Sequence, residues 1–283
     1  GGVKDIKEKV IRVLHNLSFV EDPTRVFRAI RFEQRFGFQI GKHTQNLMKN
    51  SVKVGFLERL SGGRVLSEFI LILQEGDPLP ALKRMRDFNL FHFLHPSLQF
   101  DEQAEVLFEQ IHHVISWFDL LFLEQQYGRW LIYFYGLIDF LKEGEIEDLC
   151  RRLAMNEKLK KRVREGKLQA DQALLQIFSW INANRRPKRS EIYNILDPLS
   201  TESKLFMMAK TTQVETRRYI SLYFTQLKDT KPLLRGRDLI QMGMKSGPSI
   251  KKALTGLLKA RLDEQVITRQ DEMEYISKAQ GME

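Results

Sequence analysis

The most informative stretch of the chain is residues 20–38, VEDPTRVFRAIRFEQRFGF, because it joins a marked helix start to a face rich in arginine. Asp22 followed by Pro23 is typical of a helix start: Asp accepts hydrogen bonds from free N–H groups, and Pro at the first helical position loses no bond. Gly37 is typical of a helix end, so we expect the helix to run to about Phe36. Similar periodicity recurs along the chain and strand-like alternation is rare, which predicts an all-α fold.

This helix has two contrasting faces when its residues are placed at about 100° each. The apolar arc consists of Val26, Ala29, Ile30 and Phe36. Another arc carries Arg28, Arg31 and Arg35, with Arg25 and Phe32 at its border. Neighbouring like charges repel, so an arginine row without interleaved acids favours an anionic partner from elsewhere. The alternative is a solvated face, with Asp22 serving only as a helix cap, and the spacing leaves both open.

The segment Glu21-Asp22-Pro23-Thr24-Arg25, followed by RAIRF at residues 28–32, resembles the EDxxR motif in the neck of class II tRNA nucleotidyltransferases and bacterial poly(A) polymerases. Enzymes of this family add CCA or A residues to RNA 3′ ends. The resemblance implies that Asp22 and Arg25 read the base of an incoming nucleotide, while Arg28 and Arg31 hold its triphosphate. It implies ATP, with or without CTP, as the nucleotide substrates, and tRNA or another RNA 3′ end as the partner.

The first residues, GGVKDI, resemble the end of the catalytic head domain that precedes the neck in this family. The sequence contains no Asp-x-Asp pair, which two-metal nucleotidyl transfer requires for holding its ions. We therefore expect no catalytic residue in this chain, a head domain upstream, and a need for Mg²⁺ only when that head is present. The chain alone should bind and not catalyse.

Residues 58–74 resemble the next family motif, LS.ERI..EL..IL, with Arg64 and Glu68 at the family spacing and Gly63 where Glu is usual. The resemblance, together with the i,i+4 spacing, predicts an Arg64–Glu68 pair that braces the neck with Glu21. Residues 78–96 resemble a further family segment, in which Asn89 replaces a usual Gly. Asn tolerates the left-handed conformation, so we expect that turn to survive.

The tail gives a second strong match. Residues 232–248, which include PLLRGRDLI and MGMKSGP, resemble the family's terminal P...G.DL...G...GP module, and residues 268–272 resemble its TREE segment. The pattern predicts two short helices joined by a Gly-Pro turn, and an anion-binding nest at Lys245-Ser246-Gly247. The resemblance implies contact with the tRNA elbow, for which the candidate residues are Arg235, Arg237 and Lys245.

Two basic clusters in the middle of the chain allow either of two interpretations. The first includes Lys160 and Lys161, the second Arg185 and Arg186 around Pro187. Each is either a solvated surface or a track for RNA phosphates, which carries no sequence information. The aromatic-rich residues 117–140 contain so much aliphatic filler that we interpret them as core.

Composition points the same way. The 283 residues carry a net charge of +9, with 43% hydrophobic and 29% charged residues, as expected of a globular chain with a polyanionic partner. Cys150 is the single cysteine, which fits a reducing cytoplasm. The sequence lacks a GxxxxGK loop, HExxH and CxxC, and we interpret His92, His95, His112 and His113 as packing residues, so no metal site is expected. No apolar run is long enough to predict a membrane span.

We therefore predict an elongated chain in four parts. They are residues 1–13 as the end of the head or a linker, 14–96 as a neck that binds the nucleotide base and RNA, 97–203 as a helical body, and 204–283 as a tRNA-binding tail. Two functional classes remain. The preferred one is the binding portion of an RNA 3′-end nucleotidyltransferase; the alternative is a non-catalytic all-α RNA-binding or interaction module on the same scaffold.

Overall fold

The arginine-rich helix is α3 (Arg25–Phe36) in the computed structural model, which describes residues 2–279. The helix ends where predicted, because Gly37 adopts the left-handed conformation at φ 62°. Val26 and Ile30 are fully buried, as expected of the apolar arc, but Phe36 is 54% exposed. Phe36 lies at the edge of that arc, and its ring packs instead against Phe32, with ring centroids 5.6 Å apart.

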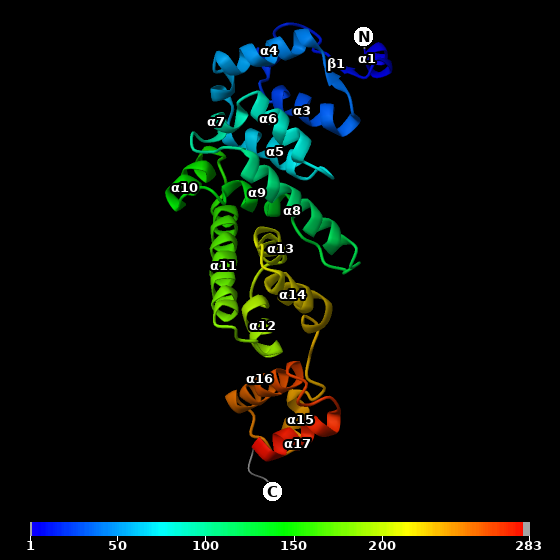
Figure 1. Ribbon diagram of the computed structural model, residues 1–283, viewed down its shortest axis with the longest axis vertical. Helices are drawn as coiled ribbons and strands as arrows, with labels where there is room; N and C mark the ends of the chain where they lie inside the picture. The colour runs from blue at the N-terminus through cyan, green and yellow to red at the C-terminus, as the bar shows by residue number, and fades with distance from the viewer. Residues whose placement is uncertain (1, 280–283) are drawn as a thin grey trace. The chain divides into compact units, whose positions relative to one another are not determined.

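The regular structure of the described residues is helical apart from two strands of two residues each, which confirms the all-α prediction (Figure 1). They fall into two compact units, one comprising the chain up to Gln169 with Thr201–Lys210, the other Ala170–Ser200 with the chain from Thr211 onward. The elements of the first unit are α1 (Gly2–Lys7), β1 (Val10–Ile11), α2 (Ser18–Glu21), α3, β2 (Gln39–Ile40), α4 (Lys42–Lys53), η1 (Phe56–Arg59), α5 (Gly62–Leu73), α6 (Leu79–Asp87), α7 (Leu90–Leu94), α8 (Glu102–Asp119), α9 (Arg129–Ile138), α10 (Glu143–Arg152), the start of α11 (Glu157–Asn182) and α13 (Thr201–Lys210). The second unit contains the end of α11, α12 (Arg189–Leu196), α14 (Val214–Leu222), the π-helical turn η2 (Tyr223–Leu227), α15 (Gly236–Gln241), α16 (Pro248–Leu262) and α17 (Arg269–Ala279). The three boundaries between the four predicted parts stay predictions.

Elements around α3 hold it in place. Strands β1 and β2 form a short parallel pair beside it, with Ile11 opposite Ile40, so the first residues combine a helix with a strand. Glu33 of α3 is buried and accepts hydrogen bonds from Arg84 Nε of α6 at 2.8 Å and from the N–H of Ile40 at 3.0 Å. Asn89 adopts the left-handed conformation at φ 55°, as its place in the family motif predicted.

The core of the first unit is built on α9, of which residues 131–138 are all buried. The helix packs against α8 and α13. Gly136 permits the close approach of α8, because a Cβ there would lie 2.6 Å from Ile111 Cδ1. The predicted aromatic core is thus correct for α9. It is wrong for the loop that follows α8 and for the residues after α9, where Phe122 is 84% and Phe140 is 51% exposed.

The tail has a small core of Leu234, Leu239, Leu257 and Ile276. Glu272, from the TREE-like segment, is fully buried and accepts hydrogen bonds from the N–H groups of Leu233 and Leu234, and from Arg261 Nη1 at 3.1 Å. A buried carboxylate needs such partners, so Glu272 ties the start of the tail to α17. The predicted Gly-Pro turn is present at Gly247, although α16 is a long helix of 15 residues.

Candidate functional site

Asp22 lies between α2 and α3 and presents one fixed and one open carboxylate oxygen. Its Oδ1 accepts hydrogen bonds from the Thr24 N–H at 3.1 Å, the Thr24 hydroxyl at 2.6 Å and Arg64 Nη2 at 2.9 Å. No residue among 2–279 donates a hydrogen bond to Oδ2. The side chain is 23% exposed. Asp22 is therefore held in one orientation with an acceptor left over.

The surroundings of Asp22 keep it ionised. Partial burial opposes the charge, but the hydrogen bonds from Thr24 and the nearby charges of Arg64 and Arg25 outweigh it and hold the pKa of Asp22 below its ordinary value. The charged form accepts hydrogen bonds and cannot donate one.

Arg25 and Arg28 project from the first turns of α3 with donors to spare. Arg25 donates from Nη1 to the Ser18 carbonyl at 3.1 Å and lies 3.7 Å from Glu21, while 42% of its side chain is exposed. Arg28 is exposed, and within the described chain its side chain has no hydrogen bond or ion pair. Glu21 also lies 3.4 Å from His15. Both arginines can therefore donate to a bound anion or base.

Arg31 differs from its neighbours because it is buried between two carboxylates. Its guanidinium lies 3.5 Å from Glu68 and 3.8 Å from Glu75, and over the Phe32 ring. Arg35 also reaches Glu75, at 3.7 Å. No acid lies between these arginines in the sequence of α3. The carboxylates that pair with them come from α5 and from the turn after it.

The predicted Arg64–Glu68 pair across one turn of α5 does not form within residues 2–279. Because α5 packs against α3, both side chains point toward that helix: Arg64 reaches Asp22 and Glu68 reaches Arg31. Sequence reasoning missed Glu75 and Thr24. Glu75 follows Glu68 by seven residues, a spacing that places both near one helix face and could have revealed it.

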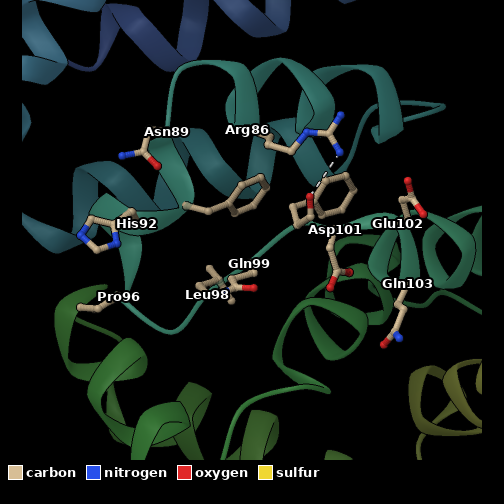
Figure 2. A pocket seen from close by; sticks show the side chains of 11 residues that line it. Arg86, Asn89, His92, Pro96, Leu98, Gln99, Asp101, Glu102 and Gln103 are labelled. Carbon is tan, nitrogen blue, oxygen red and sulfur yellow. Dashed lines mark hydrogen bonds between the residues drawn. The ribbon is translucent and has the colours of Figure 1, made fainter.

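A separate cavity of about 740 Å³ is lined by none of the residues that we predict to bind the nucleotide (Figure 2). Two of its polar side chains serve the fold. Arg86 pairs with Glu105 and donates to the Phe100 carbonyl, and Asp101 caps α8 by accepting from the Ala104 N–H. The cavity is distinct from the predicted nucleotide site, and we assign it no part in nucleotide binding.

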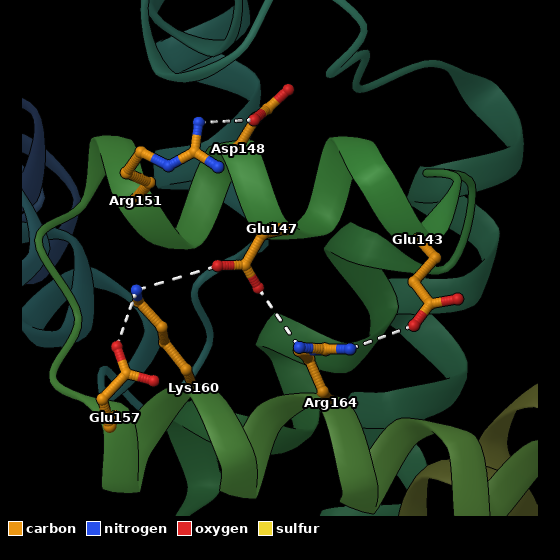
Figure 3. Close-up of polar contacts among 7 residues, drawn as sticks. All are labelled: Glu143, Glu147, Asp148, Arg151, Glu157, Lys160 and Arg164. Atoms are coloured by element: carbon orange, nitrogen blue, oxygen red, sulfur yellow. Dashed lines mark hydrogen bonds and ion pairs between the residues drawn. The ribbon is translucent and has the colours of Figure 1, made fainter.

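The basic cluster of α10 and α11 is neutralised by its own acids (Figure 3). Lys160 lies 3.0 Å from Glu157 and 3.7 Å from Glu147. Lys161 pairs with Glu165 at 3.7 Å. This arrangement matches the solvated-surface interpretation better than a phosphate track.

The remaining RNA candidates lie in the second unit. Arg185 pairs with Glu191 at 2.9 Å and stacks over Trp180. Arg186 has an exposed side chain, as do the tail candidates Arg235, Arg237 and Lys245. The described residues contain no group of three or more His, Cys, Asp or Glu side chains that could hold a metal ion. No helix described in residues 2–279 is both long and apolar enough for a membrane span.

Comparison with known proteins shows which proteins this chain is similar to. Residues 37–101 match a family described as the probable RNA and SrmB-binding site of polymerase A. The chain is 44% identical over 96% of its length to an A-adding tRNA nucleotidyltransferase of Geobacter sulfurreducens. It also resembles a CCA-adding enzyme of Thermotoga maritima solved in complex with tRNA, with a TM-score of 0.79, 28% identity, and coverage of 99% of this chain and 66% of that one.

The chain belongs to the tRNA nucleotidyltransferase family. A CCA-adding enzyme solved with CTP is also similar, with a TM-score of 0.76, 31% identity, and coverage of 99% of this chain and 65% of that chain. The chain spans 31% of the length of the Geobacter relative. Family membership accounts for the all-helical architecture and for the EDxxR-like segment at Asp22, while the roles of individual residues depend on the geometry described above.

Proposed function

We propose that this chain is the nucleotide- and RNA-binding portion of an RNA 3′-end nucleotidyltransferase that adds AMP, CMP or both from ATP and CTP to tRNA or other RNA. The observation that carries the proposal is the pair of Asp22 and Arg25. An ionised carboxylate with one open oxygen lies beside a guanidinium with open donors. The names of the similar proteins, A-adding and CCA-adding, support the same substrate class.

The chemistry of this pair suits adenine and cytosine. Each of these bases has an exocyclic amino donor next to an unprotonated ring nitrogen, so Asp22 Oδ2 can accept from the first and Arg25 can donate to the second. Guanine and uracil present a carbonyl next to a ring N–H. Their carbonyl acceptor would face the Asp22 carboxylate, and their N–H donor would face the Arg25 guanidinium. Partly buried polar groups would then stay unpaired, which lowers the affinity for these two bases.

Arg28 is the foremost candidate for the triphosphate, since its guanidinium is exposed and unpaired within the described chain. Arg31 remains in the proposal as a second phosphate ligand. A phosphate there must compete with Glu68 and Glu75, so we expect Arg31 to contribute less than Arg28. Glu21, Arg64 and Glu68 hold these groups in place.

Nucleotidyl transfer in this family requires Mg²⁺ on closely spaced carboxylates. The described residues offer no such group, so we place no metal-dependent step on this chain. Its part is to select the base, hold the phosphates and bind RNA. We expect the chain alone to be inactive.

Incubation of the full-length protein with labelled tRNA lacking its terminal nucleotides tests the proposal. We expect incorporation from ATP, with or without CTP, and none from GTP or UTP. RNA binding without incorporation of any nucleotide would favour the alternative, a non-catalytic RNA-binding module. Equal use of all four nucleotides would contradict the assignment of Asp22 and Arg25.

A further inference from the structure

Helix α3 ends in a row of three phenylalanines that the nucleotide site does not use. Phe32 stacks on Phe36 with ring centroids 5.6 Å apart, and the Phe38 ring lies 5.7 Å from that of Phe36. Gly37 permits this arrangement, because its left-handed conformation turns the chain after the helix and returns Phe38 to the side of Phe36. We call Phe32, Phe36 and Phe38 the α3 aromatic ladder.

The middle ring of the α3 aromatic ladder is open to solvent. Phe36 is 54% exposed, while Phe32 and Phe38 on either side are half-buried. The turn beside the ring is uncrowded, because a Cβ added at Gly37 would meet no atom of the described residues within 4 Å. The two flanking rings therefore hold Phe36 in place, and a flat ligand can reach its outer part.

The ladder continues the side of α3 that carries the proposed phosphate ligand. Arg28, Phe32 and Phe36 are four residues apart in turn, so they follow one another along the same side of the helix, with a rise of about 6 Å between them. Arg28 is exposed, and its side chain is unpaired within the described chain. A ligand that extends from Arg28 toward the end of α3 therefore meets Phe32 and then Phe36.

Arg35 adds a positive charge at the edge of the ladder. Its guanidinium lies 5.8 Å from the centre of the Phe36 ring, and 53% of its side chain is exposed. The ion pair with Glu75, at 3.7 Å, is longer than a hydrogen bond, and within residues 2–279 the Arg35 side chain makes no hydrogen bond. Unpaired bases stack on aromatic rings beside such cations. A purely apolar partner would instead bury this cation with its hydrogen bonds unmade, which opposes binding.

We propose that Phe36 stacks on the base of the 3′-terminal nucleotide of the RNA, the nucleotide to which the new one is added. The inference rests on the proposed function and adds the residue that positions the RNA end. Nucleotidyl transfer needs the RNA 3′ hydroxyl beside the phosphates of the incoming nucleotide, so the terminal base lies next to the groups that hold those phosphates. Every base has a π-face, so stacking on Phe36 is independent of which base ends the RNA.

The test measures stacking directly in the full-length protein. A tRNA whose last nucleotide carries 2-aminopurine reports stacking as a loss of fluorescence when the protein binds. Phe36→Ala removes the ring, Phe36→Trp enlarges it, and Phe36→Leu keeps an apolar side chain without an aromatic face. Phe122→Ala is the matched control, because Phe122 is an exposed ring in the loop after α8. Circular dichroism follows the fold of each variant.

We expect the wild type, Phe36→Trp and the control to quench the fluorescence, and Phe36→Ala and Phe36→Leu to leave most of it. In nucleotide addition the KM for RNA should rise roughly ten-fold in Phe36→Ala, as is usual when one base loses its aromatic partner. The KM for ATP and the preference for ATP over GTP should keep their wild-type values. The rise in the KM for RNA should be similar whether the RNA ends in C or in A.

A wild-type protein that binds the labelled RNA without quenching it would overturn the inference, and so would a Phe36→Ala variant that quenches like the wild type. A Phe36→Leu variant that matches the wild type would overturn it as well, because the ladder would then be an apolar contact and no stacking surface. In each case base choice at Asp22 would leave the proposed function standing. Failure of the wild type both to bind tRNA and to add a nucleotide would overturn both.

Discussion

Arg64 Nη2 of α5 donates a 2.9 Å hydrogen bond to Oδ1 of Asp22, which lies between α2 and α3. The contact joins positions 42 residues apart and, with two bonds from Thr24, fills one oxygen of the carboxylate. Asp22 is not the predicted N-cap of α3, because the helix begins at Arg25 and Thr24 is its N-cap. Its orientation is set from two sides, and its second oxygen remains available to a ligand.

Loss of this brace should affect base choice more than stability. The Arg64 side chain is 56% exposed, so Arg64→Ala should cost at most about 1 kcal/mol of unfolding free energy, as is usual for surface pairs. The ATP preference over GTP should fall a few-fold, because Asp22 can then reorient. Urea unfolding and nucleotide competition measure the two effects. A large stability loss with unchanged base choice would show that Arg64 only supports the fold.

The pH dependence of stability should reveal the charge on Asp22. Its pKa is lowered below the ordinary 3.8, so the folded state favours the carboxylate. That stabilisation is present above the ordinary pKa and is lost as pH falls through the lower folded-state pKa. Asp22→Asn should therefore be less stable than wild type at pH 7, and the gap should close in strong acid. A gap that is constant across urea titrations from pH 7 to pH 2 would argue against the ionised form.

The buried Glu272 should be a large contributor to tail stability. Glu272→Ala leaves two backbone N–H groups and Arg261 without their acceptor, which should cost about 3 kcal/mol or more. Glu274→Ala, an exposed position two residues away, should change stability by less than about 0.5 kcal/mol. Thermal unfolding of both variants checks this. Similar melting temperatures for the two would contradict the structural role of Glu272.

Two glycines should respond in opposite ways to Ala. Gly136→Ala places a methyl group 2.6 Å from Ile111 Cδ1, and such overpacking should destabilise by about 1 to 3 kcal/mol. Gly144 lies in α10 with nothing within 4 Å of the added Cβ, so Gly144→Ala should stabilise by about 0.5 to 1 kcal/mol. Denaturant midpoints for the pair decide the matter. The same sign for both would refute the close approach of α8 and α9.

The sequence was sufficient where a local pattern determines the structure. Gly37 ends α3, and Asn89 takes the left-handed turn, because both depend on a few neighbouring residues. Contacts between distant segments could not be predicted in the same way. Arg31 pairs with Glu68 of α5 and with Glu75 in the turn after α5. Both contacts depend on how α5 packs against α3. For the same reason the Arg64–Glu68 pair was expected and does not form.

The most direct test of the central claim is the nucleotide preference of the Asp22→Ala variant of the full-length protein. We expect its preference for ATP over GTP to fall by roughly 100-fold or more, because the acceptor that distinguishes the amino group from the carbonyl is gone. Arg28→Ala should weaken the use of all accepted nucleotides alike, and Arg64→Ala controls for the structural contacts of Asp22. An Asp22→Ala variant that keeps the wild-type ATP-to-GTP ratio would contradict the account and leave Asp22 with only a structural role at the turn before α3.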